Sequence, residues 1–292
     1  MGAYLRPEVC KNEQKAVIFV INSVNIFNMD LQLQNKTAFI SGSTAGIGLA
    51  IAEVLAKENA AVIINGRTKE AVEKTVATLK KSFPDARVSG IAADFGNKDD
   101  VSRLLEQLPP IDILINNVGI FEPKAFTDIP DEDWFRFFDV NVMSGVRLAR
   151  QLFPAMLKKN WGRIIFVSSE SAVFIPDEMI HYGMTKTAQL SISRGLAELT
   201  RGTNVTVNSV LPGPTKSRGV GDFVTSLAKQ DNVSFDEMEK KFFQQYRPTS
   251  LIQRFATTEE VANMVAYLVS PLASATNGAA IRVEGGLIKS AI

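Results

Sequence analysis

The sequence of 292 residues contains a single cysteine, Cys10, and a single histidine, His181. One thiol can form neither an internal disulfide nor a cysteine-rich zinc site. This cysteine usage is typical of a reducing compartment. We therefore predict a cytoplasmic protein, and we expect its chemistry to need no metal.

The sequence also lacks an excess of either charge and lacks an apolar run of membrane-spanning length. Its 32 basic and 31 acidic residues nearly cancel, so a broad surface for nucleic acid or an anionic membrane is not expected. The apolar run at residues 17–27 is too short to cross a bilayer, contains polar residues and lacks a small-residue cleavage site. We expect a small molecule as the partner, with no nucleic acid and no membrane.

The amino-terminal residues 1–28 are expected to be an extension that is not part of the native domain. The stretch that starts at Met29 leads directly into the first convincing strand. With 46% apolar residues, the chain from residue 29 to residue 292 is sufficient for one large domain.

What is present from Lys36 onward is an alternation of strand-length apolar runs and amphipathic stretches of helix length. Most runs are continuous blocks, which strands buried on both faces of a parallel sheet require. We expect strands at residues 37–41, 61–65, 87–93, 111–116, 162–168, 203–210 and 279–283, and helices at residues 47–57, 69–82, 98–108, 131–159, 178–201 and 258–269. The pattern predicts an α/β fold with a doubly wound, seven-stranded parallel sheet and helices on both faces.

A glycine-rich turn, Ser41–Gly48 (SGSTAGIG), follows the first predicted strand and opens the first predicted helix. Glycine permits a tight turn and a close approach of the backbone to a ligand, and free N–H groups at a helix start favour an anion. The turn therefore predicts a phosphate or pyrophosphate site. The same glycines would also serve an ordinary strand-to-helix turn.

The spacing G-x-x-x-G-x-G and several later motifs resemble the short-chain dehydrogenase/reductases, in the branch that carries T-G-x-x-x-G-x-G and Y-x-x-x-K. Ser41 stands where that family usually has threonine, and Val118 where it usually has alanine. The matching motifs, in order, are the glycine turn, Asp94-Phe95, Asn116-Asn117-Val118-Gly119, Asn141, Ser169, Tyr182 with Lys186, and Pro212-Gly213.

This resemblance implies a single-domain Rossmann fold that binds a nicotinamide dinucleotide. It implies four catalytic residues, Asn141, Ser169, Tyr182 and Lys186. The residues that it implies for cofactor binding are Gly42, Ser43, Thr44, Gly46, Ile47, Gly48, Arg67, Asp94, Phe95, Asn117, Gly119, Tyr182, Lys186, Pro212, Gly213 and Thr215.

Three candidates for moving a proton lie together in the stretch HYGMTK, residues 181–186. Tyr182 and Lys186 are four residues apart in a predicted helix, so their side chains share one face. A nearby cation favours the phenolate, and we expect Lys186 to lower the pKa of Tyr182. His181 points about a quarter-turn away and is expected in the pocket wall or an interface. The proton is therefore assigned to Tyr182.

Two polar residues complete the implied site. Ser169 should lie just past the carboxyl end of the fifth strand, where its hydroxyl can donate to a substrate oxygen. The resemblance favours Ser169 over the nearby Ser168 and Ser171. Asn141 is implied to hold a water that links Lys186 to solvent, although a buried structural asparagine is an alternative.

The end of the second strand predicts which dinucleotide is preferred. Gly66 occupies the position where NAD enzymes usually carry an acidic residue that binds the ribose hydroxyls, and Arg67 follows it. A guanidinium suits a 2′-phosphate. Ala45 stands where many NADP-dependent relatives carry a second basic residue. We predict a preference for NADP(H) over NAD(H), with the alternative that Arg67 is a solvated surface residue.

The inferred activity is reversible hydride transfer between a nicotinamide and a carbonyl or secondary alcohol, of the 3-oxoacyl reductase type. The alternatives are a catalytically silent dinucleotide-binding sensor or scaffold, and an epimerase or dehydratase with the same tyrosine and lysine. Residues 215–248 should form a flap over the substrate. Its apolar residues either line the pocket or form the buried faces of two amphipathic helices; they are Phe223, Val224, Leu227, Phe242, Phe243 and Tyr246. The resemblance also implies a homotetramer formed through the helices that hold Asn141 and Tyr182.

Overall fold

The computed structural model describes residues 29–291, apart from the side chains of Arg218, Asp222 and Phe223. Residues from Leu31 onward form a compact unit. The predicted extension, residues 1–28, lies outside the described residues, and so does Cys10.

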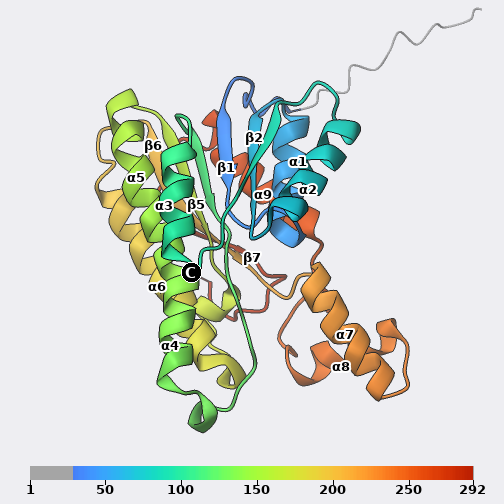
Figure 1. The fold of residues 1–292 in the computed structure, drawn as a ribbon. Helices are drawn as coiled ribbons and strands as arrows, with labels where there is room; N and C mark the ends of the chain where they lie inside the picture. Colours follow the sequence, from blue (N-terminus) through green and yellow to red (C-terminus); the bar gives the residue numbers. More distant parts are fainter. Residues whose placement is uncertain (1–28, 292) are drawn as a thin grey trace, which may run out of the picture. The chain divides into compact units, whose positions relative to one another are not determined.

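Within this unit, seven strands form one parallel sheet in the order β3-β2-β1-β4-β5-β6-β7. The chain runs outward from β1 to β3, returns to β4 beside β1, and then runs outward to β7 (Figure 1). The predicted doubly wound sheet is confirmed, and every strand lies within two residues of its predicted bounds. The strands are β1 (Thr37–Ile40), β2 (Ala61–Gly66), β3 (Val88–Ala92), β4 (Ile113–Asn116), β5 (Gly162–Val167), β6 (Val205–Pro212) and β7 (Ala280–Val283).

Helices cover both faces of the sheet, as predicted. The helices are α1 (Gly46–Lys57), α2 (Lys69–Ser82), α3 (Lys98–Gln107), α4 (Asp131–Phe138), α5 (Ser144–Lys159), α6 (Ile180–Glu198), α7 (Arg218–Gln230), α8 (Phe235–Gln245) and α9 (Thr258–Val269). One apolar core joins α1, α2 and α9 to the sheet, and a second joins α3, α5 and α6 to the opposite face. The two cores fix the sheet between two helical layers.

Local sequence explains why several helices begin where they do. The side chains of Thr68, Asn97 and Thr257 accept hydrogen bonds from first-turn N–H groups of α2, α3 and α9. At α9 the cap is reciprocal, because Glu260 also accepts from the Thr257 N–H. Such caps satisfy donors that have no partner within the helix.

The predicted helix over residues 131–159 is divided. A π-helical turn, Asp139–Met143, separates α4 from α5 and contains the predicted catalytic residue Asn141. π-helical turns are rare and often lie at functional sites. The predicted helix over residues 178–201 begins instead with a 3₁₀ turn, Asp177–Met179, and α6 follows it.

The flap, residues 215–248, contains two helices, α7 and α8, and has an apolar core of its own. Val224, Met238 and Phe243 are buried in this core together with Phe255, which follows the flap. A short parallel bridge pairs Thr215, the first residue of the flap, with Ala256, which lies after the flap in the sequence. Figure 1 shows α7 and α8 standing apart from the helical layers.

All strands run in one direction, so their carboxyl ends share one edge of the sheet. The segments that follow β1, β4, β5 and β6 therefore come together there, and they carry most of the predicted site residues. No helix within residues 29–291 is both long and apolar enough to cross a bilayer.

Candidate active site

The glycine turn after β1 is shaped by positive φ angles and by close backbone contacts. Gly42 and Gly46 have φ angles of 63° and 59°, a conformation that side chains with a Cβ atom disfavour. A Cβ atom on Gly48 would lie 2.5 Å from the Asn117 amide nitrogen and 2.5 Å from the Gly42 carbonyl oxygen. Each glycine therefore has a steric reason to be there.

Helix α1 begins in this turn without a cap. Its N-cap residue, Ala45, provides no side-chain hydrogen bond, and its first turn has no acidic residue. The helix therefore presents unpaired N–H groups and the positive end of its dipole at the carboxyl edge of the sheet. This arrangement fits the pyrophosphate of a dinucleotide.

Not every residue of the turn is available to a ligand. The Gly42 N–H donates to Asn65 Oδ1 at 3.0 Å, and the Ser43 N–H donates to the Asn65 carbonyl at 2.8 Å. The Ser43 hydroxyl donates to the Ile40 carbonyl at 2.7 Å. Gly42 and Ser43, both predicted to contact the cofactor, thus use these groups to hold the turn against β2. Thr44, Gly46 and Ile47 form its outer part.

Two asparagines and a serine lock the turn to its neighbours. Asn117 Nδ2 donates to the carbonyls of Ser41 and Gly42 at 3.0 and 2.9 Å. The Ser41 hydroxyl accepts the Asn117 N–H at 2.9 Å, so serine serves here in place of the family's usual threonine. Asn65, which sequence reasoning missed, links the turn to β3 because its Nδ2 donates to the Ile91 carbonyl. The signal available in the sequence was a single asparagine at the end of an apolar strand run, where a buried amide needs hydrogen-bond partners.

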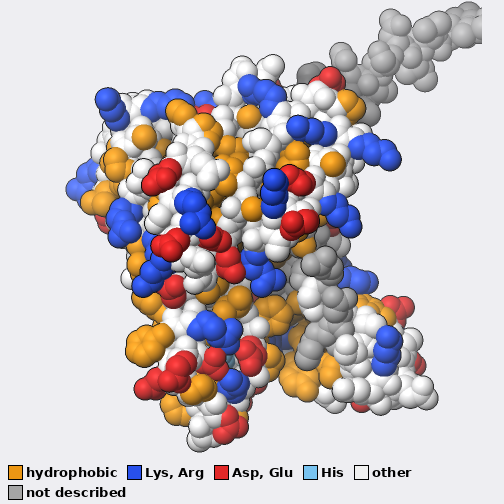
Figure 2. Space-filling view, viewed as in Figure 1, with side chains coloured by type: hydrophobic (Ala, Val, Ile, Leu, Met, Phe, Trp, Pro, Cys, Tyr) orange, Lys and Arg blue, Asp and Glu red, His pale blue; other side chains and the backbone are white. Residues whose placement is uncertain are grey.

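A cavity of about 520 Å³ opens beside this turn. Figure 2 shows the molecule hollowed between the α4 end and the α7–α8 pair, with hydrophobic side chains on both sides. Nine of the predicted site residues line the cavity: Ile47, Asn117, Gly119, Ser169, Tyr182, Lys186, Pro212, Gly213 and Thr215. The structure thus brings together residues from the ends of β1, β4, β5 and β6 and from α6.

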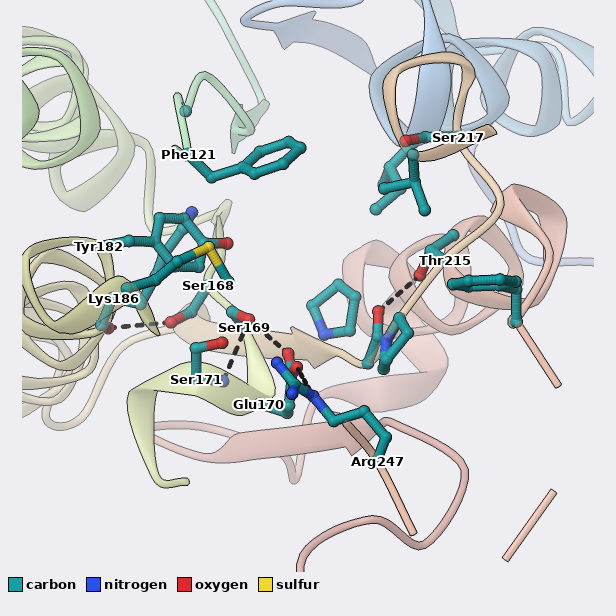
Figure 3. Close-up of a pocket in the computed structure, with 18 of the residues that line it drawn as sticks. Phe121, Ser168, Ser169, Glu170, Ser171, Tyr182, Lys186, Thr215, Ser217 and Arg247 are labelled. Atoms are coloured by element: carbon teal, nitrogen blue, oxygen red, sulfur yellow. Dashed lines mark hydrogen bonds and ion pairs between the residues drawn. The ribbon is translucent and has the colours of Figure 1, made fainter. Parts of the chain in front are cut away.

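Tyr182, Lys186 and Ser169 form one group in the cavity wall (Figure 3). The Lys186 ammonium lies 5.6 Å from the Tyr182 ring centre. It donates to the Val167 carbonyl at 3.0 Å and to Gln189 Oε1 at 3.3 Å. These bonds hold the lysine beneath the tyrosine, on the shared helix face that the spacing predicted.

The pKa values of this pair differ from the expectation. Burial raises the pKa of Tyr182, the Glu170 carboxyl raises it further, and the Ser169 hydroxyl opposes both. Burial lowers the pKa of Lys186 to about 8, against the pull of Glu170. The expected lowering of the tyrosine pKa is therefore not found in this structure, because burial of the phenol and the nearby Glu170 carboxyl outweigh the hydrogen bond with Ser169.

Asn141 lies behind this group and is fully buried. Its side chain exchanges hydrogen bonds with the backbone of Ile120 and donates to the Thr185 hydroxyl at 3.0 Å. Its carbonyl accepts from Gln189 Nε2 at 2.5 Å. Gln189, which sequence reasoning missed, thus connects Asn141 to Lys186, and its position three residues after Lys186 on α6 was the signal.

The remaining predicted residues lie away from the cavity. Asp94 accepts the Gly96 N–H at 2.9 Å in the turn after β3, and the Phe95 side chain is buried in the core. Arg67 is exposed after β2. A Cβ atom on Gly66 would lie 2.5 Å from the Thr44 methyl group. Thr44 thus fills the space that an acidic side chain at position 66 would need.

Three charged residues in the cavity wall were not predicted: Glu170, Glu178 and Arg247. Glu170 is buried beside Ser169, and Ser169 Oγ donates to Glu170 Oε2 at 2.5 Å. Arg247, from the end of the flap, lies 3.7 Å from Glu170 and 3.5 Å from Glu178. Glu170 was visible in the sequence next to the catalytic serine, but its partner lies 77 residues away.

The flap contributes the apolar part of the wall. Leu227, Phe242 and Tyr246 line the cavity, whereas Val224 and Phe243 belong to the buried core of the flap. Both roles were considered for these residues from the sequence. The side chain of Phe223, a further candidate, lies outside the described part of the structure.

His181 does not line the cavity. It is fully buried against Phe137 and Trp134, with ring centres 4.1 and 5.9 Å away. Neither ring nitrogen has a hydrogen-bond partner among the described residues. His181 thus packs under α4 and takes no direct part in the site.

Comparison with known proteins agrees with this geometry. The family model described as enoyl-(acyl-carrier-protein) reductase matches residues 42–288. The chain is 52% identical over 262 residues to the uncharacterized oxidoreductase YvaG of Bacillus subtilis, which covers 90% of this chain and 99% of that protein. It is 30% identical over 263 residues to the 3-oxoacyl-[acyl-carrier-protein] reductase FabG of Aquifex aeolicus, covering 89% of this chain and 100% of that protein.

A solved structure extends the comparison to the fold. L-sorbose reductase from Gluconobacter frateurii, complexed with NADPH and L-sorbose, superposes with a TM-score of 0.84 at 32% identity, covering 90% of this chain and 100% of that one. The sequence matches, the fold and the cavity beside the glycine turn thus all indicate the same family. The chain belongs to the short-chain dehydrogenase/reductase family of oxidoreductases.

Proposed function

We propose that the protein is an NADP(H)-preferring ketoreductase of the 3-oxoacyl reductase type. The observation that carries this proposal is the placement of Ser169, Tyr182 and Lys186 in one cavity wall, with Asn141 bonded behind them. The four residues are those that the family resemblance implies for catalysis. The relationship to the 3-oxoacyl-[acyl-carrier-protein] reductase FabG of Aquifex aeolicus supports the 3-oxoacyl class.

Each side chain has a separate role in carbonyl reduction. The nicotinamide supplies the hydride to the carbonyl carbon when it is bound. Tyr182 gives a proton to the carbonyl oxygen, and its raised pKa keeps the phenol protonated until the oxygen becomes basic. Ser169 donates a hydrogen bond to the same oxygen as negative charge develops there. Lys186, with a pKa lowered to about 8, can return a proton to the tyrosine near neutral pH.

The dinucleotide is proposed to lie along the carboxyl edge of the sheet. The uncapped start of α1 would bind the pyrophosphate, with Gly46, Ile47 and Gly48 closest to it. Asp94 and Phe95 would border the adenine, and Pro212, Gly213 and Thr215 the nicotinamide side. These positions follow the family resemblance.

The preference for NADP(H) rests on Gly66 and Arg67. Arg67 is exposed, so its guanidinium can reach a 2′-phosphate. Thr44 fills the space beside Gly66 in which an acidic residue would oppose that phosphate. L-sorbose reductase, the solved relative described above, holds NADPH.

We further propose a cytoplasmic homotetramer. Phe135 on α4 is 73% exposed and Phe138 is 40% exposed. Exposed large apolar side chains on one helix are typical of interfaces. Light scattering at micromolar concentration should give the mass of four chains, whereas a stable monomer would contradict the proposal. The extension, residues 1–28, is proposed to be dispensable for this assembly.

The activity is tested by following nicotinamide absorbance with an acetoacetyl thioester and, as comparator, L-sorbose. We expect NADPH oxidation with the thioester and none in the Tyr182→Phe variant. Reduction of L-sorbose alone would contradict the 3-oxoacyl class but retain the ketoreductase. Tight dinucleotide binding without turnover of any ketone would favour the silent sensor or scaffold.

A further inference from the structure

The hydroxyl of Ser169 is already engaged within the protein. Its oxygen accepts the Ser171 N–H at 3.1 Å, and its proton is directed to Glu170 Oε2 at 2.5 Å. A serine has one proton to donate, and an ionised carboxylate can only accept. While Glu170 is ionised, Ser169 therefore has no proton for a substrate oxygen.

The surroundings of Glu170 favour its protonated form. Glu170 is only 6% exposed, and burial raises the pKa of its carboxyl, while the bond from Ser169 and the charge of Arg247 oppose that rise. Tyr182 and Lys186 face it from α6. Burial of a carboxyl without a tight counter-charge disfavours its charged form.

The positive charge that pairs with Glu170, on Arg247, is too far away to form a direct hydrogen bond with the carboxyl. Arg247 Nε lies 3.7 Å from Glu170 Oε1 and has no hydrogen-bond partner among the described residues, although it is nine-tenths buried. The same guanidinium is shared with Glu178, whose Oε1 lies 3.5 Å from Nη2, and with the Tyr246 carbonyl. Figure 3 shows Arg247 reaching Glu170 from the side opposite to Ser169.

We propose that protonated Glu170 is a positioning residue for Ser169, and that Arg247 from the flap controls how readily Glu170 keeps its proton. The protonated carboxyl donates to Ser169 Oγ, and Ser169 then donates to the substrate oxygen. Glu170 transfers no proton in this arrangement. The hydride still comes from the nicotinamide and the proton from Tyr182, so the balance of the reaction is unchanged.

The inference rests on the proposed ketoreductase function, and it has a consequence for pH. Ionisation of Glu170 turns the Ser169 proton away from the substrate, so the rate of reduction falls as pH rises through the pKa of Glu170. Removal of the Arg247 cation disfavours ionisation and moves this fall to higher pH. A residue that only supported the fold would leave the position of the fall unchanged.

The kinetic test compares kcat/KM for carbonyl reduction between about pH 5 and about pH 9 in four proteins. The wild type should lose about tenfold per pH unit above the pKa of Glu170. Glu170→Gln keeps a donor amide at every pH and should lack this fall. Arg247→Met should move it upward, and Arg247→Lys, which keeps the cation, should leave it near the wild-type position.

A fall that persists unchanged in Glu170→Gln would overturn the proposal, since it would belong to Lys186 or another group. Equal loss of activity at every pH in Glu170→Gln would overturn it too, because that result indicates a structural role. A fall on acidification in the wild type that Glu170→Gln abolishes would mean that the ionised form positions Ser169.

A second measurement does not depend on turnover. Carbon-13 NMR of protein labelled at the glutamate carboxyls identifies Glu170 as the resonance missing in Glu170→Gln. We expect it to titrate above the ordinary glutamate range, and at higher pH in Arg247→Met. Titration at or below the ordinary value contradicts the proposal. If no ketone is reduced, the proposed function fails, whereas the titration still decides the protonation of Glu170.

Discussion

Asn141 and Ile120 exchange two hydrogen bonds across the catalytic edge of the sheet. Asn141 Oδ1 accepts the Ile120 N–H at 2.7 Å, and Asn141 Nδ2 donates to the Ile120 carbonyl at 2.9 Å. Ile120 follows Gly119 in the segment after β4 that lines the cavity. The π-helical turn thus holds this segment against Lys186.

Asn141→Ala should lower both stability and kcat. It leaves the N–H and carbonyl of Ile120 without their side-chain partner and removes the bond from Asn141 to the Thr185 hydroxyl, which costs about 1–3 kcal/mol of unfolding free energy. The loosened segment should lower kcat by about 10–100-fold. Urea unfolding and steady-state kinetics measure the two effects. Thr185→Val removes the bond from Asn141 and the bond that the hydroxyl donates to the Tyr182 carbonyl, but it keeps both bonds between Asn141 and Ile120. It should lower kcat less than Asn141→Ala, so an equal or greater loss of kcat in Thr185→Val would contradict this account.

Tyr182→Phe should abolish turnover without disturbing the fold. The ring keeps its edge contact with Phe121, at 6.3 Å between centres, and only the proton donor is lost. We expect kcat to fall by at least about 100-fold, within the range of general acid catalysis, with the dinucleotide Kd unchanged. Tyr267→Phe removes a hydroxyl from α9, away from the cavity, and is the matched control. A Tyr182→Phe enzyme with most of its activity would contradict the assignment of the proton.

Two aromatic residues of the flap have different roles: one packs in its core, and the other is positioned to contact the substrate. Phe243 is 1% exposed in the core of the flap, whereas Tyr246, three residues later, lines the cavity and is 54% exposed. Phe243→Ala should destabilise the flap by about 3–5 kcal/mol, measured as protease sensitivity within residues 215–248. Tyr246→Ala should leave that sensitivity unchanged and raise KM. The reverse pattern would show that the two roles are exchanged.

His181 makes stability depend on pH. Burial lowers the pKa of its imidazole, with Asp133 and Glu122 opposing that effect. Because the folded-state pKa lies below the unfolded value of about 6.5, the stabilising contribution is complete above that pH. This contribution to the free energy of unfolding is lost as pH falls from about 6.5 toward the folded-state pKa, by at most about 1.4 kcal/mol per pH unit.

His181→Leu keeps a side chain of similar size and should remove this dependence. The difference in unfolding free energy between wild type and variant, measured by urea titration at about pH 7.5 and about pH 5.5, isolates the histidine because the other groups are common to both. We expect the variant to gain stability relative to wild type on acidification. A constant difference would mean that the imidazole can take up a proton within the folded protein.

How far the sequence predicted this molecule depends on the range of the interactions. The strands and capped helices were predictable because apolar runs and caps such as Thr257 act over a few residues. Tyr182 and Lys186 could be placed on one face because helix geometry relates them directly. The π-helical turn at Asn141 was not predictable, since Ile120 and Gln189, which bond to it, come from other parts of the chain.

The electrostatics of the site were the least predictable. The sequence suggested that Lys186 would lower the pKa of Tyr182, but only the fold reveals how completely both side chains are removed from water. The contact of Glu170 with Arg247 joins the end of β5 to the flap, and neither residue alone indicated it. The pKa values and ion pairs of the site thus depend on burial and contacts between distant segments, which residue spacing does not reveal.

Arg67→Ala should reduce the preference for NADP(H) over NAD(H) by about 10–100-fold, which corresponds to about 1.4–3 kcal/mol for one charge-assisted contact. The loss should appear in kcat/KM for NADPH, with little change for NADH, because only the 2′-phosphate needs the guanidinium. Arg67→Lys keeps the charge but loses the planar fork and should fall between wild type and alanine. Lys74→Ala removes an exposed cation from α2, the helix that follows Arg67, and is the control for general electrostatics.

An acidic residue at position 66 tests the space beside Gly66 separately from the charge of Arg67. Gly66→Asp alone should be poorly tolerated, since its Cβ atom would lie 2.5 Å from the Thr44 methyl group. Combined with Thr44→Gly, the carboxylate gains room, and it should repel the 2′-phosphate and accept the ribose hydroxyls of NADH. We therefore expect the double variant to favour NADH in kcat/KM measured on one ketone. Equal or better use of NADH by the wild-type protein would show that Arg67 does not select the cofactor.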